Sequence, residues 1–92
     1  MKIYTKGTFH RDVASLSDVA LLEALQDKIR QLEQANDTGT ITGLKLLRGY
    51  QTHFRIKVIT ARESYRIGAI IRGSTIWLVR FLSRKKIYQK FP

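Results

Sequence analysis

The stretch HFRIKVITARESYRIGAIIRGSTIWLVRFL, residues 53–82, decides the fold class. Branched and aromatic side chains recur at every second position in three runs, which are separated by turn-forming residues around Thr60 and at Gly73. Alternation with a period of 2 is typical of β-strands, and short connections force neighbouring strands to be antiparallel. We therefore expect strands over 53–59, 64–71 and 75–82, preceded by a shorter strand over 44–48.

The first 43 residues show a different pattern. Residues 2–6 alternate and end at Gly7, which predicts a short edge strand. Apolar residues at helical spacing predict a helix over 8–16, and Ser15-x-x-Asp18 predicts the capping box of a longer helix. The apolar stripe expected on this second helix consists of Val19, Leu22, Leu25, Ile29 and Leu32.

Together these elements predict a single α+β domain over residues 1–92, because a chain of 92 residues is too short to bury a second core. An N-terminal strand and two helices are expected to pack on one face of a three- or four-stranded antiparallel sheet. In the last strand, alternation assigns Trp77, Val79 and Phe81 to the helix-facing side. The other face is expected to be open to solvent, with the basic tail 83–92 as either a short helical turn or an irregular cap.

The whole chain has a net charge of +10, and its positive charge is concentrated in the second half. Residues 1–43 hold five Lys and Arg against six acids, whereas residues 44–92 hold twelve against Glu63 alone. Self-repulsion destabilises the folded state, so this excess favours a polyanionic partner, with nucleic acid first. An acidic protein partner and a merely soluble basic surface are the alternatives. The cations expected to bind RNA around the site are Lys45, Arg48, Arg62, Arg80, Lys85, Lys86 and Lys90.

Common catalytic and cofactor chemistries lack their residues. There is no Cys for a disulfide, a thiolate zinc site or a nucleophile, and Glu63 has no second acid nearby to form a catalytic pair. His10 and His53 fit neither a triad nor a metal-ligand spacing, and no glycine motif for nucleotides occurs. We expect no metal, no cofactor and, since no export signal or membrane span is recognisable, a cytoplasmic location.

Cations gather on one side of the predicted sheet. Alternation places Arg55 and Lys57 on the same face, with Arg66 on the next strand and Arg84 after the last one. Like charges that face each other in a sheet are destabilising unless a ligand neutralises them. This pattern predicts a phosphate-binding surface, beside which Tyr88 can stack on a base.

Four segments in order carry a family resemblance: GLKLLRG at 43–49, FRIKV at 54–58, SYRI at 64–67 and VRFLSRKKIY at 79–88. Over nearly the whole chain the sequence resembles the RelE/ParE superfamily of bacterial toxins from type II toxin–antitoxin systems. The resemblance implies a RelE-like fold. For the RelE branch it implies an mRNA interferase, a ribosome-dependent endoribonuclease that cuts mRNA in the A site, inhibits translation and is silenced by an acidic cognate antitoxin. The catalytic positions it implies are Arg55, Lys57, Arg66, Arg84 and Tyr88.

Two positions depart from the family pattern: Arg55 stands where Lys is frequent, and Ser83 stands where related toxins often have His. The alternatives are a ParE-like inhibitor of DNA gyrase and a catalytically weak, antitoxin-bound member. The expected mechanism is metal-independent attack of the ribose 2′-OH on the adjacent phosphate. Lys57 would accept the proton, Arg55 and Arg66 would hold the nonbridging oxygens, Arg84 would act at the leaving 5′ oxygen, and Tyr88 would orient a base.

Overall fold

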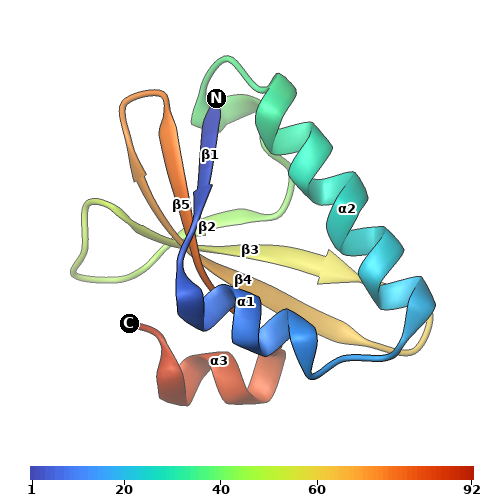
Figure 1. Cartoon of the computed structure of the whole chain (residues 1–92). Helices are drawn as coiled ribbons and strands as arrows, with labels where there is room; N and C mark the ends of the chain where they lie inside the picture. Colours follow the sequence, from blue (N-terminus) through green and yellow to red (C-terminus); the bar gives the residue numbers. More distant parts are fainter.

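The computed structural model describes all of residues 1–92 and confirms the predicted order of a strand, two helices and an antiparallel meander. None of its helices has the length and apolar character needed to cross a membrane. The elements, drawn in Figure 1, are β1 (Lys2–Thr5), α1 (Gly7–Ala14), α2 (Val19–Gln34), a 3₁₀ turn (Thr38–Thr40), β2 (Leu44–Leu46), β3 (His53–Ile59), β4 (Ser64–Arg72), β5 (Thr75–Ser83) and α3 (Arg84–Lys90).

The five strands form one sheet in the order β1-β5-β4-β3-β2. The strands β2 to β5 pair antiparallel, whereas β1 pairs parallel to β5 at the edge of the sheet. Parallel neighbours need a long crossover connection, and here α1 and α2 carry the chain from β1 to the opposite edge. The tight turn between β4 and β5 contains Gly73 with a positive φ of 57°. The predicted edge strand is confirmed as β1, but it is itself part of the sheet, which has five strands instead of the three or four expected.

The main core lies between the sheet and the two N-terminal helices, and Figure 1 shows α2 along one side of the sheet. The α2 stripe differs from the predicted one. Leu21, Leu25 and Leu32 are buried, whereas Val19 is 67% exposed. Val19 precedes Leu25 by six residues, which at 3.6 residues per turn places it about 120° around the helix from the buried line. The sheet residues of this core include Ile56, Val58, Ile67, Ala69, Ile71, Ile76, Leu78 and Phe81.

The cap of α2 also differs from the predicted capping box. Asp18 is itself the N-cap residue, and its Oδ1 accepts a hydrogen bond from the Leu21 amide at 3.1 Å. Ser15 instead donates its hydroxyl to the Asp12 carbonyl at the end of α1, at 2.8 Å. A side-chain oxygen at the N-cap satisfies an amide that has no partner within the helix, so Asp18 alone fixes the helix start at Val19.

A register shift in the sheet overturns the predicted faces of β5. Gly68 lies opposite Arg80 and Ala69 lies opposite Leu78, so Val79 has no partner on β4. An extra residue of this kind reverses the alternation beyond it. Leu78 and Phe81 consequently both face the helices, whereas Trp77 and Val79 belong to the opposite face.

That opposite face is partly covered, contrary to the expectation of an open surface. The tail forms α3, which confirms the helical alternative for residues 83–92. Its buried side chains Ile87 and Phe91 form a second, smaller cluster with Leu47, against which Val79 and Leu82 pack. The sheet is therefore sandwiched at one end between the α1–α2 layer and α3.

The Asp12 carboxylate ties α1 to the irregular part of β5. It accepts hydrogen bonds from Arg80 Nε at 2.8 Å, from Arg80 Nη2 at 3.0 Å and from the Phe81 amide at 2.9 Å. The hydroxyl of Thr8 donates to the carbonyl of Val79, the unpaired residue. Polar groups that the register shift removes from the β-ladder thus find their partners on α1.

We expect Asp12→Ala to lower the free energy of unfolding by about 2–4 kcal/mol, because it leaves a partly buried guanidinium and the Phe81 amide without their acceptor. The matched control is Asp27→Ala, since Asp27 pairs with Arg30 at 2.7 Å with both side chains well exposed. That change should cost under about 1 kcal/mol. Urea denaturation of the two variants measures the difference, and equal losses would contradict the role given to Asp12.

Candidate active site

The five predicted catalytic residues line a single cavity of about 350 Å³. The cavity lies between the sheet and α3, on the face opposite the main core. Of the residues expected to bind RNA around the site, Lys45 also lines it. The complete lining is Gly43, Lys45, Arg55, Lys57, Ile59, Ser64, Arg66, Arg84 and Tyr88.

The strands bring the cations together in two facing pairs. Lys45 of β2 lies directly opposite Arg55 of β3, and Lys57 of β3 lies directly opposite Arg66 of β4. Like charges directly opposite each other on neighbouring strands are destabilising. The chain contains two ion pairs, Asp27 with Arg30 and Asp12 with Arg80, so none of these four cations is neutralised by a carboxylate.

Arg66 is the one charged residue that is buried, with 7% of its surface exposed. Its Nη1 donates to the Ser64 hydroxyl and to the Tyr65 carbonyl, both at 3.0 Å. The pKa of Arg66 is lowered, chiefly by burial and further by the charges of Arg84 and Arg55, whereas Tyr88 raises it. A guanidinium keeps its proton under such conditions, so Arg66 is a fixed positive charge that lacks a negative partner.

Tyr88 and Arg84 reach the cavity from α3, four residues apart and therefore on one side of the helix. The Arg55 guanidinium lies over the Tyr88 ring, 4.2 Å from its centre. The pKa of the Tyr88 hydroxyl is lowered, chiefly by Arg84 as a hydrogen-bond donor and further by the charges of Arg55 and Arg66. One face of the ring is thus occupied by Arg55, and 55% of Tyr88 remains exposed for a ligand.

The position of α3 depends on a close approach of Phe91 to Gly68. A Cβ atom at Gly68 would lie 2.6 Å from Phe91 Cγ, so only glycine leaves room for the ring. The start of α3 is fixed by Ser83, whose hydroxyl accepts from the Lys86 amide at 3.3 Å. Ser83 therefore has a capping role.

The other residues expected to bind RNA lie outside this cavity. The Arg80 guanidinium is bound by the Asp12 carboxylate, so its charge, unlike those in the cavity, already has a negative partner. Arg48 and Arg62 are exposed on the connections beside β3, and Lys85, Lys86 and Lys90 are exposed on α3. No three His, Cys, Asp or Glu side chains lie close enough together to hold a metal ion.

Two supporting residues of the site escaped the sequence reasoning. Gly43 has a φ of 76°, its carbonyl accepts the Lys57 amide at 3.0 Å, and a Cβ there would lie 3.0 Å from Lys57 Cβ. Ser64 holds Arg66, as described above. The spacing of two residues between Ser64 and Arg66 could have indicated their contact. The contact between Gly43 and Lys57 depends on strand pairing and has no local signal in the sequence.

A larger cavity of about 500 Å³ lies between α2 and β3 and shares Gly43, Lys57 and Ile59 with the first. Its one further cation, Lys28, already donates to Gln31 Oε1 at 2.8 Å, to the Thr42 carbonyl at 2.9 Å and to Thr42 Oγ1 at 3.0 Å. Burial lowers the pKa of Lys28. Lys28 therefore links α2 to the segment before β2, and the unpaired cations remain in the smaller cavity.

The structure is a small α+β fold with an unneutralised cationic cavity under a C-terminal helix, which defines the class of small basic proteins with a binding site for anions. The sequence matches no protein-family model. It is 37% identical, over 97 aligned positions that span both chains completely, to Toxin RelE3 of Methanocaldococcus jannaschii. The chain therefore belongs to the RelE family of toxins of toxin–antitoxin systems.

Solved structures agree with this assignment. The RelB-RelE antitoxin-toxin complex from Methanococcus jannaschii contains a chain with a TM-score of 0.73 and 27% identity, covering 97% of this chain and 99% of that one. A metal-bound toxin from Helicobacter pylori has a TM-score of 0.55 and 20% identity, covering 95% and 98%, and shares the fold. The predicted RelE-like fold is confirmed.

We expect Arg84→Ala to raise the pKa of the Tyr88 hydroxyl toward the ordinary tyrosine value, because the change removes the group that lowers it most. Ultraviolet absorbance of tyrosinate during an alkaline titration, with a Tyr88→Phe variant subtracted to isolate the signal of this residue, measures the shift. An identical titration curve with and without Arg84 would contradict the assigned contact.

Proposed function

We propose that this RelE-family toxin is an mRNA interferase, a ribosome-dependent endoribonuclease that inhibits translation by cutting mRNA in the A site. The observation that supports this proposal most strongly is the set of unpaired cations around one cavity, Arg55, Lys57, Arg66 and Arg84, with Tyr88 beside them. An RNA phosphate supplies the negative charge that this cluster lacks. The affinity of the cluster for phosphate rises further as charge develops on the phosphorus oxygens during the reaction.

In the proposed reaction the ribose 2′-oxygen attacks the adjacent phosphorus, and the bond from phosphorus to the 5′ oxygen breaks. Lys57 accepts the proton of the 2′-OH. Arg55 and Arg66 hold the nonbridging oxygens, and the fixed geometry of the buried Arg66 makes it the better-oriented clamp. Arg84 stabilises the leaving oxygen by charge, because a guanidinium is too weak an acid to give up its proton. Lys57 takes the proton as a neutral amine, since its ammonium form has no lone pair, and then returns it as an ammonium to the leaving 5′ oxygen. The products are a 2′,3′-cyclic phosphate and a 5′-hydroxyl.

Tyr88 has two tasks in this scheme. Its inner face orients Arg55 through the cation–π contact, and its exposed face is available to stack on a base. The cavity lining contains neither a histidine nor a carboxylate as a stronger proton acceptor. Much of the rate enhancement must then come from the alignment of the RNA backbone, which explains why the ribosome is needed.

The mechanism is tested on ribosomes programmed with an mRNA that carries a 2′-methoxy group at the scissile ribose. We expect the unmodified mRNA to be cut and the modified one to resist, because its 2′-oxygen has no proton to lose. Lys57→Ala should slow cleavage of the unmodified mRNA by about 100-fold or more, the usual contribution of a general base. Lys57 is exposed, so the variant should stay folded, whereas a change at the buried Arg66 also risks stability.

Lys6→Ala is the matched control, because Lys6 is an exposed lysine at the start of α1 and outside the cavity. Cleavage of the 2′-methoxy mRNA would refute the mechanism. Failure to cut any mRNA, together with inhibition of DNA supercoiling by gyrase, would instead assign this toxin to the ParE-like activity.

We also propose a cognate acidic antitoxin as the protein partner, since the neighbouring RelE structure is an antitoxin complex and this chain carries a net charge of +10. Electrostatic steering makes such an association fast and sensitive to salt. A small acidic protein encoded beside this gene should copurify with it and suppress its toxicity, with an association rate that falls as salt rises. If the protein encoded beside this gene neither binds this toxin nor suppresses its toxicity, the result would count against this partnership.

A further inference from the structure

A row of four side chains crosses the sheet on the face that carries the cavity. Tyr4 of β1 lies opposite Trp77 of β5, Trp77 lies opposite Ile70 of β4, and Ile70 lies opposite His53 of β3. The Tyr4 and Trp77 rings are stacked, with centroids 6.1 Å apart and an interplanar angle of 23°. Tyr4 is 51% exposed, and the other three members are partly exposed. We call Tyr4, Trp77, Ile70 and His53 the aromatic row.

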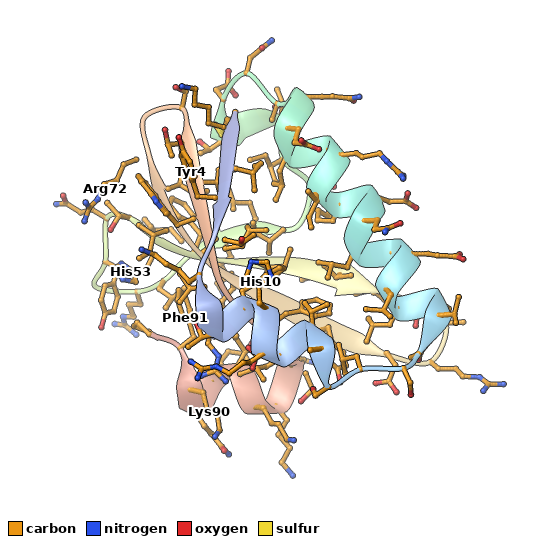
Figure 2. All side chains as sticks on the ribbon, in the orientation of Figure 1. Tyr4, His10, His53, Arg72, Lys90 and Phe91 are labelled. Carbon is orange, nitrogen blue, oxygen red and sulfur yellow. The ribbon has the colours of Figure 1, made fainter.

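Cations lie beside this row, and the strands that carry it contain no acids. Lys2 of β1 and Arg72 of β4 are both exposed and lie on either side of Thr75 of β5. Lys2 is two residues from Tyr4 along β1, and Arg72 is two residues from Ile70 along β4. None of the strands β1, β3, β4 and β5 contains an acidic residue. In Figure 2, Tyr4, Arg72 and His53 lie on the same side of the molecule, away from α2. The surface is thus apolar and aromatic in the middle and positive at its margin.

The aromatic row is continuous with the cavity. On β4, Ile70 and Arg66 are four residues apart, which is about 13 Å along a strand. Between them lies Gly68, which is covered by Phe91, and the Phe91 ring also contacts His53 with centroids 5.8 Å apart. Figure 2 shows Phe91 next to His53 along this side. The buried Phe91 ring therefore lies between Arg66 and the aromatic row and packs against the row at His53.

We propose that the aromatic row is a stacking platform for single-stranded RNA, which it holds a few nucleotides away from the bond in the cavity. The inference extends the proposed function, since it assumes that RNA is the ligand of this face. Exposed rings on a sheet face stack on bases of any sequence, and neighbouring cations meet the phosphates. An acidic peptide would satisfy Lys2 and Arg72 but gives no reason for a stacked pair of rings of which Tyr4 is half exposed and Trp77 partly exposed.

Binding can be measured without cleavage and without ribosomes, because Trp77 is the only tryptophan of the chain. The probe is a 2′-methoxy oligouridine of about 12 nucleotides, within the site sizes of single-strand-binding domains. We expect the oligonucleotide to quench Trp77 fluorescence in the wild-type protein. Tyr4→Ala should raise the Kd by about 5- to 150-fold, the range that corresponds to one base–ring stack, and Tyr4→Phe should bind like wild type.

Matched variants separate stacking from general attraction. Val19→Ala removes an exposed apolar side chain from α2 on the other side of the sheet and should leave the Kd unchanged. Arg72→Ala should weaken binding more than Arg11→Ala, which removes an equal charge from an exposed position on α1. In the wild-type protein, quenching that depends on Tyr4 is expected whether or not the ribosomal assay shows cleavage, so the two proposals fail separately.

Two results would overturn the proposal. One is a Kd for the oligouridine that does not change in Tyr4→Ala while the variant remains folded by thermal melting. The other is equal quenching of Trp77 by a polyglutamate peptide with the same dependence on Tyr4, which would make this face a protein-docking surface.

Discussion

The register shift in β5, held by the carboxylate of Asp12, determines which side chains meet on each face of the sheet. Before the shift, Leu78 faces the helices; after it, Phe81 faces them and Leu82 lies opposite Arg66 on the other side. Without the extra residue the alternation would turn Phe81 out of the core. Because Asp12 binds both the Arg80 side chain and the Phe81 amide, the first helix maintains a geometry on which the core, the packing of α3 and the site all depend.

The two faces of the sheet have opposite tasks. One buries branched and aromatic side chains from strands and helices and supplies most of the stabilisation. The other concentrates cations that repel one another, with Lys45 facing Arg55 and Lys57 facing Arg66. Such a surface lowers stability in the free protein and becomes favourable only when an anion enters. The molecule therefore retains an electrostatic strain that binding relieves, and this is the physical basis of the proposed activity.

Sequence reasoning succeeded where local pattern determines structure. Alternation placed the faces of β3 and β4 correctly, and with them the positions of Arg55, Lys57 and Arg66, because those strands pair without interruption at these residues. It failed at β5, where the register depends on Gly68 across the sheet and on Asp12, 69 residues before the amide it binds. For the same reason Arg80 could not be distinguished from the cations around it, since its partner lies 68 residues away.

The contact of Phe91 with Gly68 helps to hold α3 on the sheet, so the site has two parts that differ in local stability. Arg55, Lys57 and Arg66 belong to strands that are paired on both sides, whereas Arg84 and Tyr88 belong to a helix held by the small cluster of Leu47, Ile87 and Phe91. Local opening of a small cluster requires less free energy than global unfolding. The fraction of molecules with a complete site is therefore set by the docking equilibrium of seven helical residues and one aromatic ring, and it can fall while the rest of the protein stays fully folded.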